Sequence, residues 1–302
     1  MLAAAAGVWA LARRRRLQDA RVLRDFALRV AEGRFEPRLP AGSGGELGAL
    51  EAALAKLAEK AEGDQVRTKA LEQLRRDFVA NVSHELRTPL TAIQGFAETL
   101  LDGALEDPEH RREFVEDIAR NAEMLKKLID DLLTLSAIES KEAKLDFRPL
   151  RLSEVWKRVL PTLSHQAITF QVSLAAELPD SLPPVVADPD KLGQVFLNLV
   201  ANAVKYNQPG GSVTVRASED HGHVRVSVSD TGIGIPEEDL PRLFERFYRV
   251  DKGRSRDLGG TGLGLSIVKH IVEAHQGSVS VESVQDQGSV FSFTLPKVQS
   301  PR

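Results

Sequence analysis

The chain has 302 residues, of which 42% are hydrophobic and 27% are charged, so it is long enough for two domains with real hydrophobic cores. It contains no cysteine, which excludes disulfides, thiolate catalysis and cysteine-ligated metal centres. The formal net charge of −3 gives no support to nucleic-acid binding, and we expect no nucleic-acid partner.

The N-terminus joins an apolar run to a basic one. Residues 1–12 are apolar and residues 13–16 are all arginine, which is the wrong order for a signal peptide. This order is typical of the cytoplasmic end of a membrane helix, but a helix over 1–12 reaches only about 18 Å against a hydrocarbon core of about 30 Å. Three interpretations of residues 1–16 stay open: the end of a truncated membrane span, an interfacial anchor, or a solvated helix start. The first places the chain at the cell membrane, with the residues after the arginines in the cytoplasm.

Residues 17–65 are predicted to form two helices joined by an irregular connector. Apolar residues near a 3.6-residue period predict a helix over 17–31, which the glycines and prolines of 33–45 end. Regularly spaced leucines predict a second helix over 46–62. Because this second helix starts with the sequence ELG, the arrangement resembles a HAMP signal-relay module. A plain coiled-coil linker is the alternative.

Residues 66–143 are predicted to form two longer amphipathic helices. The first carries an apolar stripe from Leu71 to Leu101, and the second carries one from Phe114 to Leu135. A single hairpin leaves part of each apolar face uncovered, whereas two hairpins paired into a four-helix bundle bury both faces. We therefore predict a homodimer.

From residue 144 onward the periodicity changes, and short β-rich runs alternate with helical stretches. The runs at 213–217 and 224–229 are joined by a short polar turn, which predicts an antiparallel hairpin. The whole pattern predicts an α+β sandwich with helices over one face of a mixed sheet. The other predicted strands are 168–174, 278–283 and 290–295, and the predicted helices are 153–166, 189–207, 237–249 and 262–275.

The heptapeptide SHELRTP at residues 83–89 lies inside the first long helix. Thr88 follows His84 by four positions, so both share one helix face. Neutral imidazole is a nucleophile that can attack a γ-phosphate, and Glu85 can accept the other ring proton as a base. Pro89 lacks an N–H group and is expected to kink or loosen the helix. A lone helical histidine is more often an exposed polar residue. The surrounding heptapeptide favours a catalytic role for His84 instead.

Two asparagines lie four positions apart on the helix predicted over 189–207. Asp188 followed by Pro189 is a helix-start signal, and Asn198 and Asn202 then face one way. Carboxamide oxygens suit Mg²⁺, a hard cation that bridges phosphates. Two asparagines on a solvated face are the alternative, but the flanking residues are apolar and bury much of this helix.

Two glycine groups follow. Gly232 and Gly234 come directly after Asp230, and glycines let a backbone approach a flat base while the carboxylate accepts from an adenine amino group. A simple Asp-Gly turn is the alternative for this group. The second group opens a helix whose free N–H groups form an anion site. It consists of Gly260, Gly262 and Gly264.

Together, and in this order, these motifs resemble the sensor histidine kinases of bacterial two-component systems over roughly residues 17–297. Residues 78–103 are similar to the phosphate-regulon sensor kinases in particular. The resemblance implies a HAMP relay (17–65), a dimeric four-helix-bundle phosphoacceptor domain (66–143) and an ATP-binding α+β sandwich (144–298). It also implies ATP-dependent phosphorylation of His84, transfer to an aspartate in the receiver domain of a response regulator, and dephosphorylation of that regulator.

The resemblance also implies a role for each motif residue. His84 is the phosphoacceptor, Glu85 is the general base, and Thr88 positions water for the phosphatase reaction. Asn202 holds Mg²⁺. The residues implied to bind ATP are Asn198, Lys205, Tyr206, Asp230, Gly232, Gly234, Gly260, Gly262 and Gly264.

Two other classes fit part of the pattern. ATPase machines with the same nucleotide fold, such as the gyrase and MutL ATPases, lack a phosphoacceptor helix like the one over 66–102. Residues 250–260 are charged and glycine-rich, which suits a mobile lid. A non-catalytic scaffold of the same family is expected to have lost Asn202, Asp230 or the lid glycines, and all of them are present here.

Overall fold

The computed structural model describes residues 2–36, 45–140, 145–251 and 260–298, and it divides into two compact units, residues 1–80 and 81–302. The first unit is helical. It contains α1 (Leu2–Ala31) and the start of α2 (Glu46–Leu101), and Leu23, Phe26 and Ala58 are buried. The connector predicted between these helices falls mostly on 37–44, outside the described residues. No helix among the described residues combines the length and the apolar character that a membrane crossing requires.

The helices predicted over 46–62 and from residue 66 are a single helix, α2, of 56 residues. The polar stretch between them has Gly63 as its only helix-weakening residue. One glycine in a helix costs about 1 kcal/mol, which the rest of a long helix easily offsets. The assignment of residues 17–65 to a HAMP module therefore stays a prediction, and α2 runs on without a break toward His84.

The second unit starts with a helical hairpin. The end of α2 is followed by a short 3₁₀ helix, η1 (Ala104–Glu106), and by α3 (Arg111–Glu139). The rings of Phe96 and Phe114 meet across the hairpin with their centroids 5.9 Å apart. Pro89 lies inside α2, where the helix continues past it. The predicted helical phosphoacceptor region is thus confirmed as a hairpin, and its pairing with a second hairpin stays a prediction.

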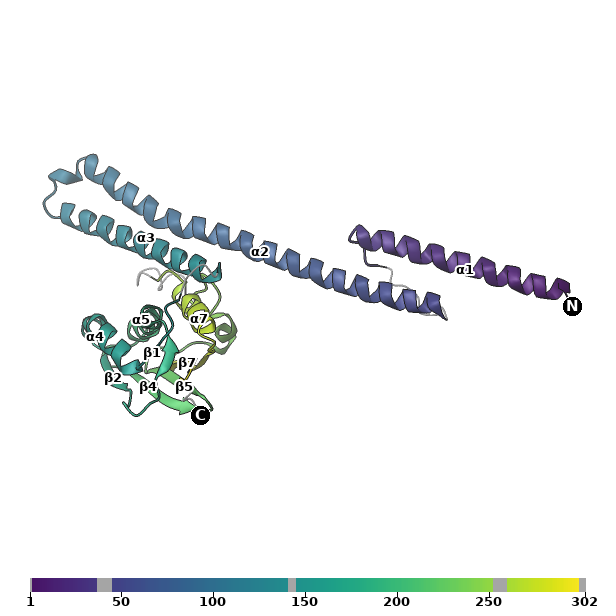
Figure 1. Cartoon of the computed structure of the whole chain (residues 1–302). Coiled ribbons are helices and arrows are strands. Elements are labelled where there is room, and N and C mark those ends of the chain that lie inside the picture. Colours follow the sequence, from purple (N-terminus) through teal and green to yellow (C-terminus); the bar gives the residue numbers. More distant parts are fainter. Residues whose placement is uncertain (1, 37–44, 141–144, 252–259, 299–302) are drawn as a thin grey trace. The chain divides into compact units, whose positions relative to one another are not determined.

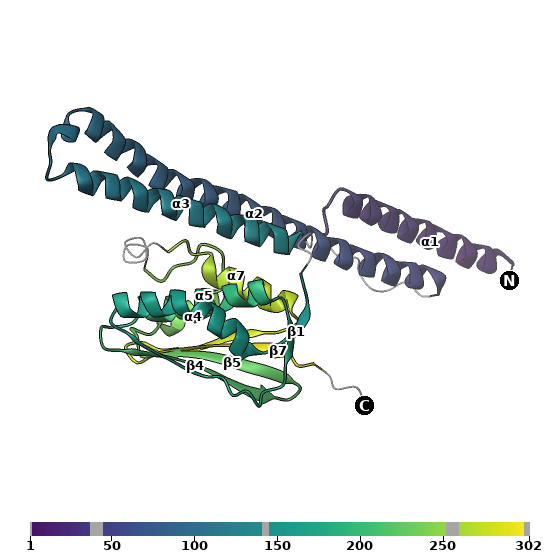
Figure 2. The same ribbon diagram turned by 60° about the vertical axis from the view of Figure 1, so that its left-hand side comes forward.

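The C-terminal part is a two-layer α+β sandwich, as predicted (Figure 1). Its five-stranded sheet has the order β2-β4-β5-β7-β6, with β2 and β4 parallel and the other neighbours antiparallel. Figure 2 shows α4, α5 and α7 over one face of this sheet. The strands are β1 (Arg148–Leu150), β2 (Ser173–Glu177), β3 (Val185–Ala187), β4 (Ser212–Asp220), β5 (His223–Asp230), β6 (Val279–Val284) and β7 (Gly288–Pro296). The helices are α4 (Leu152–Thr169), α5 (Pro189–Lys205), η2 (Glu237–Arg242) and α7 (Gly264–Ala274).

The core of the sandwich lies between the sheet and the three helices. On β5 the residues Val224, Val226 and Val228 are fully buried at alternate positions, as a half-buried strand requires. Phe196 of α5 connects the layers. Its ring centroid lies 5.9 Å from that of Phe293 of β7 and 5.8 Å from that of Trp156 of α4. This packing fixes the buried face of α5 against the sheet.

Two predicted elements are wrong in their extent. The strand predicted over 168–174 is the end of α4 followed by β2 from Ser173, because the apolar run there spans both a helix end and a strand start. The helix predicted over 237–249 is only the 3₁₀ helix η2. Pro236 precedes it and Pro241 lies within it, and a proline cannot donate the hydrogen bond that an α-helix needs.

Candidate functional site

A cavity of about 380 Å³ opens beside α5, between the end of β5 and the glycine segment before α7. Of the residues predicted to bind nucleotide or metal, all but Gly232 line it. They are Asn198, Asn202, Lys205, Tyr206, Asp230, Gly234, Gly260, Gly262 and Gly264. Three segments far apart in the sequence therefore meet at one cavity.

Asp230 lies at the end of β5 and forms part of the cavity wall. Its carboxylate accepts a hydrogen bond from the backbone N–H of Gly232 at 2.8 Å. Burial raises the pKa of Asp230, while the backbone N–H groups of Gly232 and Ser289 act in the opposite direction. A buried carboxylate that still has acceptor capacity is suited to hold an amino group of a ligand.

The two glycines after Asp230 are required by close approaches of the backbone. A Cβ on Gly232 would lie 2.4 Å from the carbonyl oxygen of Tyr206. Gly234 has a positive φ of 64°, and a Cβ there would lie 2.1 Å from the carbonyl oxygen of Val284. Gly232 thus allows the chain after β5 to pack against the end of α5, next to the cavity. Its predicted contact with nucleotide stays a prediction.

Asn198 and Asn202 project from the face of α5 that lines the cavity. The side-chain nitrogen of Asn198 is buried and has no hydrogen-bond partner among the described residues. An unsatisfied buried amide costs about 1–3 kcal/mol, so this group is prepared for a ligand. Gly264 lies beside it, and a Cβ at that position would be 3.4 Å from the Asn198 side-chain oxygen.

Three cationic side chains reach the same cavity, and the sequence analysis had singled out only one of them. Burial lowers the pKa of Lys205 to about 8, and the charges of Lys127 and Arg249 act in the same direction. Lys127 comes from α3, and Arg249 comes from the segment after η2. The local sequence around Lys127 and Arg249 carries no signal for either role, because each reaches the cavity only through tertiary packing.

Two further cavity residues were also missed by sequence reasoning. Gln166 and Phe170 come from the C-terminal end of α4 and line the wall of the cavity. Phe170 is partly exposed. Their positions in the sequence resemble an ordinary helix end, so no local pattern distinguishes them.

His84 is exposed on α2 and is not among the residues that line the cavity. It lines a shallow depression together with Arg87, Thr88 and neighbouring residues of the next helical turn. The Thr88 hydroxyl donates to the backbone carbonyl of His84 at 3.2 Å. Glu85 faces elsewhere, because its carboxylate accepts from Arg249 at 2.8 Å in an ion pair that is largely buried. The general-base role of Glu85 stays a prediction.

Comparison with known proteins identifies these two regions. Residues 74–141 match the family described as His Kinase A (phospho-acceptor) domain, and residues 187–299 match the family described as Histidine kinase-, DNA gyrase B-, and HSP90-like ATPase. The chain is 39% identical over 241 residues to the sensor histidine kinase WalK of Bacillus subtilis, covering 77% of this chain and 38% of WalK. The chain belongs to the bacterial two-component sensor histidine kinases.

Other relatives and solved structures agree with this family. The kinase is 38% identical over 238 residues to the sensor-like histidine kinase SenX3 of Mycolicibacterium smegmatis, covering 79% of this chain and 62% of SenX3. The histidine kinase ThkA, solved in complex with the response regulator protein TrrA, matches with a TM-score of 0.61 and 28% identity over 79% of this chain and 66% of that chain. Full-length ShkA, solved in complex with AMPPNP, matches with a TM-score of 0.56 and 31% identity over 76% of this chain and 47% of that chain.

The chain spans less than two thirds of the length of these curated relatives. Within it, the two matched families overlap the predicted phosphoacceptor domain (66–143) and the predicted ATP-binding domain (144–298). His84 lies in the first match, and the cavity residues from α5 to α7 lie in the second. The kinase thus carries a domain of the ATP-binding type, and the exact domain boundaries stay predictions.

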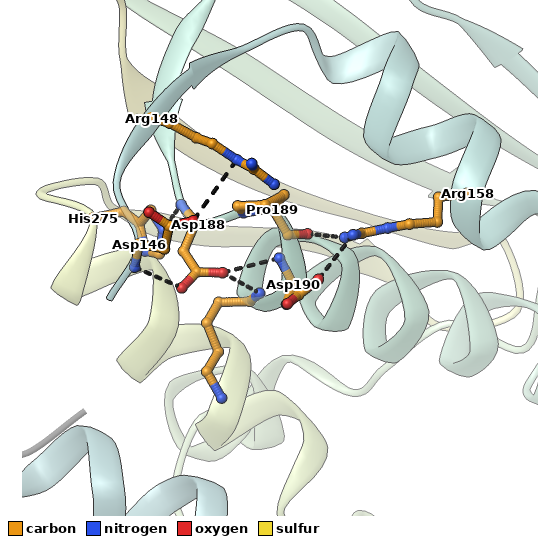
Figure 3. A network of polar contacts seen from close by, with 8 residues as sticks. Asp146, Arg148, Arg158, Asp188, Pro189, Asp190 and His275 are labelled. Atoms are coloured by element: carbon orange, nitrogen blue, oxygen red, sulfur yellow. Dashed lines mark hydrogen bonds and ion pairs between the residues drawn. The ribbon is translucent and has the colours of Figure 1, made fainter. Parts of the chain in front are cut away.

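A buried polar network supports the start of α5 in this kinase, as Figure 3 shows. The carboxylate of Asp188 caps the helix by accepting from the backbone N–H groups of Asp190 and Lys191, and it also accepts from Asp146 at 3.0 Å. Burial alone would raise the pKa of Asp188, but these three N–H groups hold it below its usual value. The network therefore ties the first residues of the ATP-binding domain to the helix that carries both asparagines.

His275 completes this network from the end of α7. Its Nε2 accepts from the backbone N–H of Asp188 at 3.0 Å, and its Nδ1 donates to the carbonyl of Ile271 at 2.7 Å. The ring also meets Phe147 edge-on, with centroids 4.9 Å apart. Both ring nitrogens of neutral His275 already form hydrogen bonds. A second proton would have to bind Nε2, where it would point at the backbone N–H group of Asp188. Burial lowers the pKa of His275 accordingly.

We expect the ATP-binding domain to lose stability in mild acid through His275. Its pKa in the folded state is below the ordinary value of 6.5, so the unfolded chain binds the proton more readily. The contribution of neutral His275 to the free energy of unfolding is complete above pH 6.5. Below pH 6.5 this free energy falls by at most about 1.4 kcal/mol per pH unit. Urea unfolding at pH 7.5 and 5.5, followed by the fluorescence of buried Trp156, measures this difference.

The matched variant is His275→Gln, whose side-chain oxygen can still accept from Asp188 but does not titrate in this range. We expect it to remove most of the pH dependence between pH 7.5 and 5.5. Asp188 titrates below this window, since its pKa is lowered. An unchanged pH dependence in His275→Gln would rule out His275 as its source.

Proposed function

We propose that this chain is an ATP-dependent protein-histidine kinase that phosphorylates His84. The observation that carries the proposal is the pairing of an exposed histidine in SHELRTP with a cavity that gathers Asp230, Asn198, Asn202 and Lys205 in the adjoining domain. In the reaction, a ring nitrogen of His84 forms a bond to the γ-phosphorus of ATP. The bond from that phosphorus to the β–γ bridging oxygen breaks, and ADP leaves.

The remaining roles follow from the chemistry of each group. Glu85 takes the proton that the attacking imidazole must lose, which requires its carboxylate to leave Arg249. Asp230 accepts from the amino group of the adenine ring. Lys205 and Arg249 stabilise the negative charge of the phosphates.

Mg²⁺ fits the amide groups of this cavity. Among the residues that the structure describes, no group of three or more His, Asp or Glu side chains is placed to hold a metal ion. A cation here would therefore rest on the amide oxygen of Asn202 and on phosphate oxygens, which is the ligand set that Mg²⁺ prefers. When bound, it would neutralise charge that develops on the phosphates.

Incubation of the full chain with γ-labelled ATP tests the kinase function. We expect a labelled protein whose label survives base and is lost in acid, since phosphohistidine is a phosphoramidate. Label that is stable in acid would indicate a serine, threonine or unrelated acceptor and would contradict the proposal. ATP hydrolysis without any labelled protein would favour an ATPase instead.

The physiological acceptor is proposed to be an aspartate in the receiver domain of a response regulator. The similar kinase ThkA was solved in complex with a response regulator protein, and the exposed depression around His84 and Thr88 is the docking place that we propose for this chain. Transfer moves the phosphoryl group from the ring nitrogen to a carboxylate oxygen. The same face would support hydrolysis of the phosphorylated regulator.

Replacing Thr88 with alanine should separate these two activities. The hydroxyl is exposed and bonds only the His84 carbonyl among the contacts described, so attack on ATP does not need it. We expect autophosphorylation to stay within a few-fold of wild type, while dephosphorylation of the regulator slows about tenfold or more, or about 1.4 kcal/mol of barrier. Both rates are measured on one preparation. Equal loss of both would show that Thr88 instead supports the helix near Pro89.

A homodimer is proposed for the phosphoacceptor hairpin. The hairpin leaves large apolar side chains exposed on both helices, and pairing two hairpins would cover them. They are Leu90, Leu101, Val115, Ile129 and Leu133. Light scattering of the purified chain tests the proposal, because a monomer at micromolar concentration would contradict it.

Membrane attachment through residues 1–16 is likewise proposed, with the catalytic region on the cytoplasmic side. Its support is the order of an apolar run and four arginines, which matches the inner end of a membrane helix. Residues 17–65 would then relay a signal as a HAMP module. Flotation of the chain with anionic vesicles, compared with a chain that lacks residues 1–16, tests the attachment.

A further inference from the structure

Helix α3 of the phosphoacceptor region takes part in the nucleotide cavity through Lys127. This residue lies outside the matched ATPase family, which begins at residue 187. One helical turn later, the side chain of Asp131 is buried and accepts a hydrogen bond from the Thr261 hydroxyl at 2.9 Å. Thr261 lies in the glycine segment that borders the cavity. The bond therefore fixes α3 where Lys127 faces the nucleotide site.

The same face of α3 continues the contact for two more turns. Leu135 is only 1% exposed, and Glu139 forms ion pairs with Arg246 and with His270. Positions 127, 131, 135 and 139 are four residues apart, so they lie on one stripe of the helix. Lys127 is thus the first member of a continuous docking face rather than a side chain that happens to lie near the cavity.

Three cationic side chains gather at this end of the cavity, because Lys127, Lys205 and Arg249 all line it. Arg249 pairs with Glu85, but its Nε is buried and has no hydrogen-bond partner among the described residues. Lys205 is partly buried and its pKa is lowered, first by burial and then by the two other cations. Asp131, one turn after Lys127, accepts from Thr261, and burial raises its pKa although the charge of Lys127 acts to lower it. A polyphosphate would relieve this repulsion.

We propose that Lys127 is a phosphate-binding residue of the nucleotide site, supplied by the phosphoacceptor helix α3. Binding of a nucleoside triphosphate and docking of α3 on the ATP-binding domain then favour each other. This coupling is reciprocal, since a ligand that contacts both sides stabilises the docked arrangement and the docked arrangement binds the ligand more tightly. The inference rests on the proposed function only in taking ATP as the ligand.

The test compares three variants of the full chain by calorimetric titration with AMPPNP and with AMP, in the presence of Mg²⁺. Lys127→Gln should weaken AMPPNP binding by about tenfold, the effect of one charged hydrogen bond, and leave AMP binding nearly unchanged. Lys127→Arg should retain most of the AMPPNP affinity. Lys126→Gln is the matched control, because Lys126 is an exposed neighbour that does not line the cavity.

Three outcomes would overturn the assignment. Wild-type affinity for AMPPNP in Lys127→Gln would show that the residue makes no phosphate contact. Equal weakening of AMPPNP and AMP would indicate a general structural effect. Equal weakening by Lys126→Gln would mean that only the overall charge of α3 matters.

The coupling to docking is tested in a double-mutant cycle with Glu139→Lys. This change places a cation against Arg246 and His270, so it should weaken docking without touching the cavity. If α3 must be docked for Lys127 to act, Lys127→Gln should have a much smaller effect on AMPPNP binding in the Glu139→Lys background. An undiminished effect would overturn the coupling.

Failure of the kinase function would look different. If the chain forms no phosphohistidine but AMPPNP binding responds to Lys127 as expected, the proposed function falls and the binding role stands. If phosphohistidine forms at the normal rate but Lys127→Gln binds AMPPNP like wild type, only the inference about α3 is rejected.

Discussion

Replacing His84 with glutamine is expected to abolish phosphoprotein formation while AMPPNP still binds. Glutamine keeps the polarity and approximate size of the side chain but has no nucleophilic nitrogen. His84 is exposed on α2 and lines none of the nucleotide cavity, so the loss of the imidazole leaves that cavity intact. Labelling with γ-labelled ATP and titration with AMPPNP on the same preparation measure both properties.

The matched control is His110→Gln. His110 is an exposed histidine at the start of α3 whose ring contacts Asp107 at 2.8 Å, far along the hairpin from the heptapeptide. We expect it to label at nearly the wild-type rate. Acid-stable label on the His84→Gln protein would reject His84 as the acceptor, and loss of AMPPNP binding would show that the substitution damages more than the acceptor.

Most of the fold was predictable because its signals are local. The Asp188–Pro189 start signal marks the true beginning of α5, and the alternation of valines in β5 matches the buried positions of that strand. The extent of two elements was not predictable in this way. A run of apolar residues does not show where α4 ends and β2 begins, since either element can bury it.

The residues of the candidate site also fall into two groups, those in local sequence motifs and those brought in by tertiary packing. The sequence singles out Asn198, Asn202 and Asp230, because each belongs to a short motif whose residue types suit phosphate, metal or base. All three line the cavity, and their roles there stay predictions. The ion pair of Glu85 with Arg249 joins residues 164 positions apart, and the bond of Asp131 with Thr261 joins residues 130 positions apart. Such contacts depend on how a helical hairpin packs on a sandwich, which no local pattern encodes.

His275 illustrates a further limit. In the sequence it is one of seven histidines, at a helix end before a glycine, and nothing separates it from the others. Its importance comes from the tertiary structure. The side chain is only 2% exposed, and it accepts a hydrogen bond from the backbone N–H of Asp188, 87 positions away in the sequence. Burial of a titratable ring is a property of the tertiary structure, so its effect on stability becomes visible only there.

Replacing Asn202 with alanine is expected to cost about 100-fold or more in autophosphorylation, or about 2.7 kcal/mol of barrier. The proposed reason is the loss of an amide oxygen that holds Mg²⁺ beside the phosphates. The fold should survive, because Asn202 projects from the cavity-lining face of α5, while Leu199 and Val200 are buried outside the cavity lining. Alanine also has a higher helix propensity than asparagine.

Two variants make this expectation specific. Gln194→Ala, two turns earlier on α5 and outside the cavity lining, should keep the wild-type rate. Asn202→Asp should recover part of the activity at high Mg²⁺, since a carboxylate is also an oxygen ligand for this cation. Rates are measured as a function of Mg²⁺ concentration, alongside thermal unfolding of each variant. A wild-type rate in Asn202→Ala would show that the asparagine pair is structural. If neither high Mg²⁺ nor the Asn202→Asp substitution restores any of the lost rate, Asn202 contacts the nucleotide rather than the metal.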